Sequence, residues 1–146
     1  MSDLPETSEL EIGDDGTGLA RYPLGWLHIN CGVTCHNANA NAEGRKTMMY
    51  LKLKADLLDG RASSDFDTIV RTVNQPARTQ QWLDRPRIVP GDPDASLLVE
   101  LLETRVEGAG NKQMPPVGTR IVDEDSAEQI RAWIAAMTPV EEMTAN

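Results

Sequence analysis

The chain has 146 residues, 40 % of them hydrophobic, and a formal net charge of −9. The length suits one domain with some spare chain. The charge disfavours nucleic-acid binding, because phosphate contacts need a basic stripe, and no apolar run is long enough to predict a membrane span.

Residues 1–18 contain six acidic residues and no Lys or Arg. This composition predicts an acidic flexible tail or linker. The residues after Met1 form neither a basic nor an apolar region, so no signal peptide is recognised at this end. We expect the folded domain to span residues 19–138 and a flexible C-terminal tail to follow at 139–146.

Three later segments carry apolar residues at helical spacing, at about 66–73, 93–102 and 125–137. Ser63 and Ser64 are candidate caps for the first, and Asp92 followed by Pro93 predicts the start of the second. Asp125 and Glu128 have capping-box spacing for the third. Together with long loops and no βαβ alternation, these segments predict an all-α fold.

The two cysteines, Cys31 and Cys35, are followed at once by His36. Cysteine thiols can add across the two vinyl groups of haem, and the adjacent imidazole then ligates the iron through Nε2. The usual spacing is C-x-x-C-H, and this motif has one more residue between the cysteines, which needs a slightly larger loop. The motif therefore predicts haem bound through Cys31, Cys35 and His36.

Three other interpretations of the motif stay open. A disulfide between Cys31 and Cys35 is sterically feasible, although so small a loop adds little stability. A zinc site would need further ligands in a chain whose other histidine is His28. The third interpretation is a pair of core thiols beside an unrelated histidine. A second axial ligand would favour haem over all three.

Met114, which precedes Pro115 and Pro116, is the candidate for that ligand. A thioether opposite a histidine favours reduced iron and raises the potential. Methionine is flexible, and two prolines stiffen the loop that carries it. The rival ligands are Met48, Met49 and His28.

Two residues between these motifs are candidates for contact with the same group. Arg87 is a natural partner for a haem propionate, although a solvated arginine before a turn explains it equally well. Pro90 is a candidate to offer its carbonyl to the Nδ1–H of His36, which would strengthen the ligand. Trp26 and Trp133 are expected to pack the first segment against the last helix.

The chain resembles a bacterial c-type cytochrome domain of the class I-like kind over about residues 24–137. The resemblance rests on four motifs in the family's order: Cys-Gly-Val-Thr-Cys-His at 31–36, Pro-Gly-Asp-Pro at 90–93, Met-Pro-Pro at 114–116, and a helix containing Trp-Ile at 133–134. It implies a small class I-like cytochrome c fold, with three to five short helices around one covalent haem c ligated by His36 and Met114.

The resemblance also implies a function. The domain would carry single electrons between extracytoplasmic partners, a redox protein or a fused oxidoreductase domain, and would not itself be an enzyme. Its place would be the periplasm or cell envelope, and it would be monomeric in isolation. Two alternatives stay open: a haem-free or vestigial interaction module with a Cys31–Cys35 disulfide, and a haem enzyme or gas sensor in which Met114 is displaced.

Overall fold

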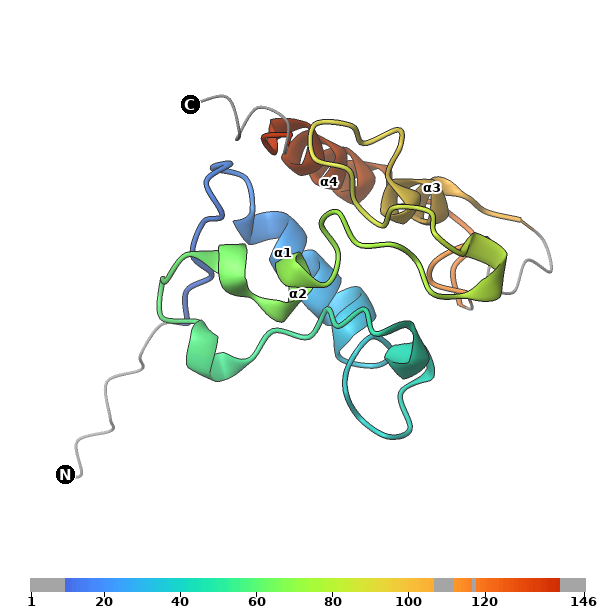
Figure 1. Ribbon diagram of the computed structural model, residues 1–146, viewed down its shortest axis with the longest axis horizontal. Coiled ribbons are helices and arrows are strands. Elements are labelled where there is room, and N and C mark those ends of the chain that lie inside the picture. Colours follow the sequence, from blue (N-terminus) through green and yellow to red (C-terminus); the bar gives the residue numbers. More distant parts are fainter. Residues whose placement is uncertain (1–9, 107–111, 117, 140–146) are drawn as a thin grey trace.

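The computed structural model describes residues 10–106, 112–116 and 118–139. The parts of the expected tails at 1–9 and 140–146 lie outside the described residues. Within them the fold is all-α, as expected, without a β-strand. The α-helices, labelled in Figure 1, are α1 (Arg21–Leu27), α2 (Asp67–Val70), α3 (Leu97–Glu103) and α4 (Glu124–Ala136). No helix in the described residues is long and apolar enough to span a bilayer.

Helix α4 lies against both α1 and α3 and forms one wall of the main core. Its apolar face is fully buried, as expected, through Ile130, Trp133 and Ile134. At the edge of this contact the Nε1–H of Trp26 donates to Asp123 at 3.2 Å. Asp123 also accepts from the backbone N–H of Ser126 at 3.1 Å and caps the helix. Helix α4 therefore begins before the capping box that the sequence predicted.

Helix α3 carries the buried leucines expected of it but starts later than the sequence predicted. Asp92 accepts from the backbone N–H of Ala95 at 3.0 Å, and Ser96 donates to the carbonyl of Asp92 at 2.8 Å. Gly91 adopts a φ of 79°, which glycine tolerates without strain. The Pro-Gly-Asp-Pro segment is thus a closed turn, and the helix follows it from Leu97.

Helix α2 is a single turn, shorter than the predicted segment at 66–73. The hydroxyl of Thr72 donates to the carbonyl of Thr68 at 2.5 Å, and the backbone N–H of Ile88 donates to the carbonyl of Thr72 at 3.2 Å. Val73 then pairs with Ile88 in an isolated β-bridge. The β-branched residues after the helix therefore favour this extended pairing over another helical turn.

Residues 10–18 pack against the domain, so the predicted boundary at residue 19 is wrong. The backbone N–H of Glu11 donates to the carbonyl of Leu58 at 3.0 Å. The Nε1–H of the buried Trp133 donates to Asp15 at 2.8 Å. Asp14 accepts from the backbone N–H groups of the two glycines that follow it. Acidic composition predicted a solvated tail here, but these aspartates serve as hydrogen-bond acceptors in a folded turn.

Candidate haem site

The two cysteines lie on a turn that continues helix α1. A π-helical turn, His28–Gly32, follows directly from α1. The backbone N–H of Val33 donates to the carbonyl of His28 at 2.9 Å, and that of His36 donates to the carbonyl of Cys31 at 2.8 Å. Both bonds span five residues, one more than an α-helical turn does. The wider turn accommodates the additional residue of the motif without breaking the helix axis.

Asn37 closes the end of this turn. Its side chain is buried, and its amide donates to the carbonyls of Gly32 at 2.8 Å and Val33 at 3.1 Å. These carbonyls have no partner further along the helix, because the helix ends here. The side-chain oxygen accepts from the backbone N–H of Asn39 at 2.9 Å. Asn37 therefore acts as a cap that holds the cysteine–histidine turn.

The imidazole of His36 is held by a backbone carbonyl. Its Nδ1 lies 3.3 Å from the carbonyl oxygen of Met49. We expected this carbonyl to come from Pro90, which is buried, and that expectation is wrong. Since a carbonyl only accepts, Nδ1 carries the proton and Nε2 keeps its lone pair. Burial lowers the pKa of His36; the hydrogen bond to Met49 opposes this, the charge of Arg87 adds to it, and the net shift is downward. The ring is therefore neutral and has the tautomer that an iron ligand needs.

Gly44 lies against the same imidazole. A Cβ atom at this position would stand 2.7 Å from Nδ1 of His36 and 2.8 Å from the carbonyl oxygen of Cys35. The backbone N–H of Gly44 donates to that carbonyl at 3.0 Å. Only a residue without a side chain leaves the imidazole in place, so Gly44 helps to set the position of His36.

Both cysteines are free thiols, so the disulfide considered above is not formed in this structure. Cys31 is buried in the main core, and Cys35 is half-buried. Burial raises the pKa of the Cys31 thiol to about 12, with a further contribution from Cys35. Cys31 is therefore a neutral thiol within an apolar environment, whereas Cys35 is the more accessible of the two sulfurs.

His28, a rival ligand, also contacts the backbone through Nδ1, but as an acceptor and not as a donor. Its Nδ1 accepts from the backbone N–H of Leu53 at 3.0 Å. The lone pair of Nδ1 is therefore engaged, and Nε2 carries the proton. In this tautomer neither ring nitrogen of His28 is available to a metal. The ring instead holds the extended segment that ends at Leu53 against the end of α1.

The contact of His28 predicts a pH dependence of stability. Burial lowers the pKa of His28 from its ordinary value, and Lys52 lowers it further. Below about pH 6.5 the unfolded chain therefore takes up a proton before the folded chain does. We expect the free energy of unfolding to fall as the pH is lowered from 7 to 5, measured by urea denaturation.

The matched variant is His28→Asn, which keeps an acceptor for the Leu53 N–H but has no titrating ring. Its free energy of unfolding should depend less on pH over the same range. The depressed carboxyl groups, such as Asp67, titrate below this range and do not interfere. An equal pH dependence in His28→Asn and the wild type would refute the assignment.

Met114 is held by its own backbone and by its neighbour. The backbone N–H of Met114 donates to the carbonyl of Leu101 in α3 at 2.8 Å. The buried amide of Gln113 donates to the carbonyls of Pro115 at 3.1 Å and Thr119 at 3.2 Å. Gln113 thus closes the loop that carries Met114, a role that the sequence did not indicate.

The described contacts do not bring Met114 and His36 together. Met114 is half-buried and packs in a small apolar cluster with Leu97, Leu101 and the partly buried Trp82. Cys31, next to His36 on the motif turn, belongs to the main core instead. Met114 and Cys31 of the motif turn therefore lie in different apolar clusters.

Arg87 is a buried structural arginine whose side chain contacts backbone. Its two Nη groups donate to the carbonyl of Arg71 at 2.6 Å and that of Thr47 at 2.5 Å. The second bond ties down the segment that leads to Met49, whose carbonyl holds His36. Arg87 thus lies close to the site without a described contact to the motif itself. Its role toward a propionate stays a prediction.

Sequence reasoning missed Asn37, Gly44, Gln113 and the carbonyl of Met49. A buried glycine or amide has no periodic pattern, and a carbonyl leaves no sequence signal at all. For Asn37 a signal exists, because an Asn directly after a helical turn is a common C-terminal cap.

The residues of the motif have the donor chemistry that haem attachment uses. An imidazole whose Nδ1 is held by a carbonyl and two free thiols on one turn are groups of the kind that covalent attachment and axial ligation involve. The described residues contain no cluster of three or more His, Cys, Asp or Glu side chains placed to hold a metal ion. A haem needs no such cluster, because the porphyrin supplies four of the iron's ligands. No protein-family model, curated protein or solved structure matched this chain.

Proposed function

We propose that the chain is a monohaem c-type cytochrome domain that carries single electrons between extracytoplasmic redox partners. The observation that supports this most is the state of His36. Its Nδ1 donates to the carbonyl of Met49, which leaves Nε2 as a donor beside two free thiols. This is the tautomer that ligation through Nε2 requires, whereas His28 has the opposite tautomer.

In this proposal each residue has a defined role. The thiols of Cys31 and Cys35 would each add across a vinyl group of the haem, so that a carbon–sulfur bond would form and the thiol hydrogen would pass to the other vinyl carbon. Nε2 of His36 would ligate the iron, and the carbonyl of Met49 would strengthen this donor. Met114 would supply a thioether as the second protein ligand. The haem, when bound, supplies a reversible one-electron change of its iron.

The proposal also specifies a partner and a location. If His36 and Met114 both ligated the iron, no position would be left for a substrate, and the partner would be another redox protein or a fused oxidoreductase domain. The resemblance described above implies the periplasm or cell envelope as the location. Of the described residues near the motif, Ile29 and Val33 are exposed and would lie where such a partner docks.

The test is the intact mass of the exported chain beside its reduced absorption spectrum. The full chain is produced with an export signal and the haem-attachment machinery. We expect a mass increase of one haem and the spectrum of a low-spin haem. The Cys31→Ala, Cys35→Ala double variant should have the mass of its polypeptide.

Single-cysteine variants show how many thioethers form, because each retained bond leaves haem attached under denaturing conditions. A colourless wild-type chain with the mass of its amino acids would refute the proposal and favour a haem-free interaction module. Carbon monoxide binding to the reduced wild-type protein would favour an enzyme or sensor.

A further inference from the structure

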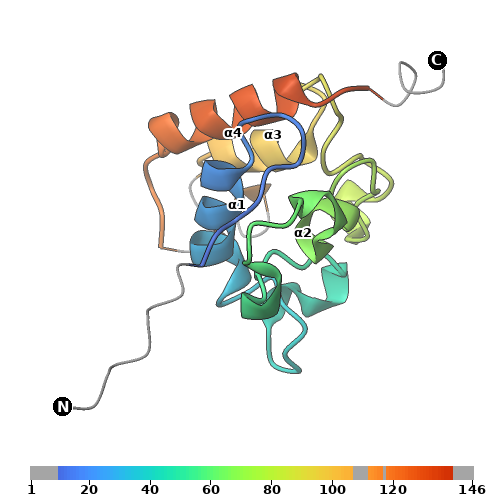
Figure 2. The ribbon, with the colours of Figure 1, turned by 90° about the vertical axis from the view of Figure 1, so that its left-hand side faces the viewer.

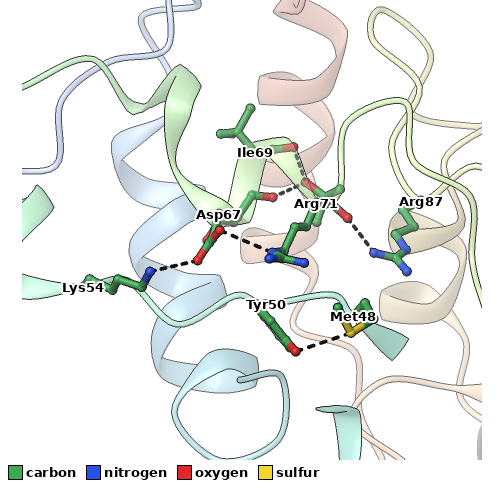
Figure 3. A network of polar contacts seen from close by, with 9 residues as sticks. Met48, Tyr50, Lys54, Asp67, Ile69, Arg71 and Arg87 are labelled. Carbon is green, nitrogen blue, oxygen red and sulfur yellow. Dashed lines mark hydrogen bonds and ion pairs between the residues drawn. The ribbon is translucent and has the colours of Figure 1, made fainter. Parts of the chain in front are cut away.

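A cavity of about 300 Å³ is lined by several charged side chains. Asp67 reaches it from helix α2 and Arg71 from the end of that helix, and Arg78 and Arg87 reach it from the long loop that follows. Met48 also lines it, and the neighbouring residue supplies the carbonyl at His36. Figure 3 shows Asp67, Arg71 and Arg87 close together with Met48. Three arginines and one aspartate thus share one opening.

The aspartate does not neutralise the arginines as a group. Asp67 pairs with Lys54 at 3.1 Å and with Nε of Arg71 at 3.3 Å, as Figure 3 shows. Among the described residues no ion pair includes Arg78 or Arg87. The cavity therefore carries two positive charges without a carboxylate partner.

The burial of Arg87 makes this excess of positive charge energetically unfavourable. It is 5 % exposed, and the acceptors of its two Nη groups are neutral backbone carbonyls. Burial lowers the pKa of Arg87, and the charges of Arg78 and Arg71 lower it further. A buried cation among other cations is stabilised when an anion enters its cavity. Guanidinium groups have five N–H donors, so Arg87 has donors left for such an anion.

The remaining arginine is held in place. The guanidinium of Arg71 lies 4.5 Å from the ring centroid of Tyr50, and Asp67 orients it from the preceding turn of α2. Arg71 therefore holds its positive charge at a fixed position, and its side chain loses little further conformational entropy when a ligand binds.

We propose that this cavity is an oxyanion site, in which Arg78 and Arg87 bind a carboxylate or phosphate group beside Arg71. Guanidinium groups suit these ligands because their donors match the paired oxygens. Two sources share this chemistry: a free oxyanion from solution, and the carboxylates of a haem held at His36. The second source rests on the function proposed above, and the first does not.

The test measures the binding of inorganic phosphate to the purified full chain by calorimetry at low ionic strength. Arg78→Gln is the informative variant, because Arg78 is exposed and its loss leaves the fold intact. We expect it to weaken phosphate binding about threefold. Arg87→Lys keeps the positive charge but loses the paired N–H donors of the guanidinium, and should weaken phosphate binding about tenfold. Arg120→Gln removes an exposed arginine that does not line the cavity and should change nothing.

A second arm addresses the other source. If the purified chain carries haem, the carboxylates of the haem would occupy the site and exclude phosphate. In that case the reduction potential is measured from pH 5 to 9. Arg78→Gln should then shift the pH dependence of the potential, and Arg120→Gln should not. If the chain exported with the haem-attachment machinery is haem-free and binds phosphate, the oxyanion site is supported and the cytochrome proposal alone is refuted. If Arg78→Gln behaves as the wild type, in phosphate binding for a haem-free chain or in the pH dependence of the potential for a haem-containing chain, the oxyanion site alone is overturned.

Discussion

Replacing Met114 by alanine is expected, if the chain holds haem as proposed, to lower the reduction potential by on the order of 0.1 V while the haem stays covalently attached. Axial ligands set haem potentials over a range of about 0.8 V, and a thioether favours the reduced iron. The backbone of Met114 is held by Leu101 and its loop by Gln113, so the truncated side chain leaves the loop in place. Potentiometry followed by the visible spectrum measures the change.

The same variant should bind carbon monoxide when reduced, because the face opposite His36 then has an open position. Met48→Ala and Met49→Ala are the matched controls, since each removes a thioether from a rival position. Both variants should keep the reduction potential of the wild type, and neither should bind carbon monoxide. If Met48→Ala or Met49→Ala opens the iron to carbon monoxide and Met114→Ala does not, Met114 is not the ligand.

The second large effect is expected at Gly32, inside the cysteine motif. A Cβ atom there would lie 2.5 Å from the backbone carbon and oxygen of Leu51 and from the nitrogen of Lys52. Backbone atoms cannot rotate away as a side chain does, so Gly32→Ala must separate the π-helical turn from this segment. We expect the free energy of unfolding to fall by about 1–3 kcal/mol, measured by urea denaturation.

Gly25→Ala is the matched control, because Gly25 lies within helix α1, shortly before the motif turn. A Cβ atom there would meet only the side chain of Ile12, at an ordinary distance of 3.6 Å. Alanine also favours the helix, so this variant should be as stable as the wild type or more stable by up to about 1 kcal/mol. Equal stabilities of Gly32→Ala and Gly25→Ala would show that the turn and the 51–52 segment do not touch as described.

The helical class and the buried faces could be read from apolar spacing. Ile130, Trp133 and Ile134 repeat at helical intervals, and all are buried in α4. Helix limits were read less well, because capping depends on which of several neighbouring acceptors meets a free N–H. Asp123, rather than Asp125, makes that contact for α4. Likewise, composition alone does not separate a solvated acidic tail from aspartates whose oxygens accept hydrogen bonds in a folded turn.

For the candidate site, sequence by itself determined that Cys35 and His36 are neighbours, with Cys31 one turn away, since residues close in the chain stay close in any fold. It singled out His36 by its place in the motif, but it did not indicate the tautomer of either histidine, because the tautomer of each ring depends on the backbone group that it meets. Only the tertiary structure decided this: a carbonyl from Met49 contacts one ring, and an N–H from Leu53 contacts the other. The arginine cavity is of the same kind, because Arg71, Arg78 and Arg87 share one opening only after the loop beyond α2 has folded back.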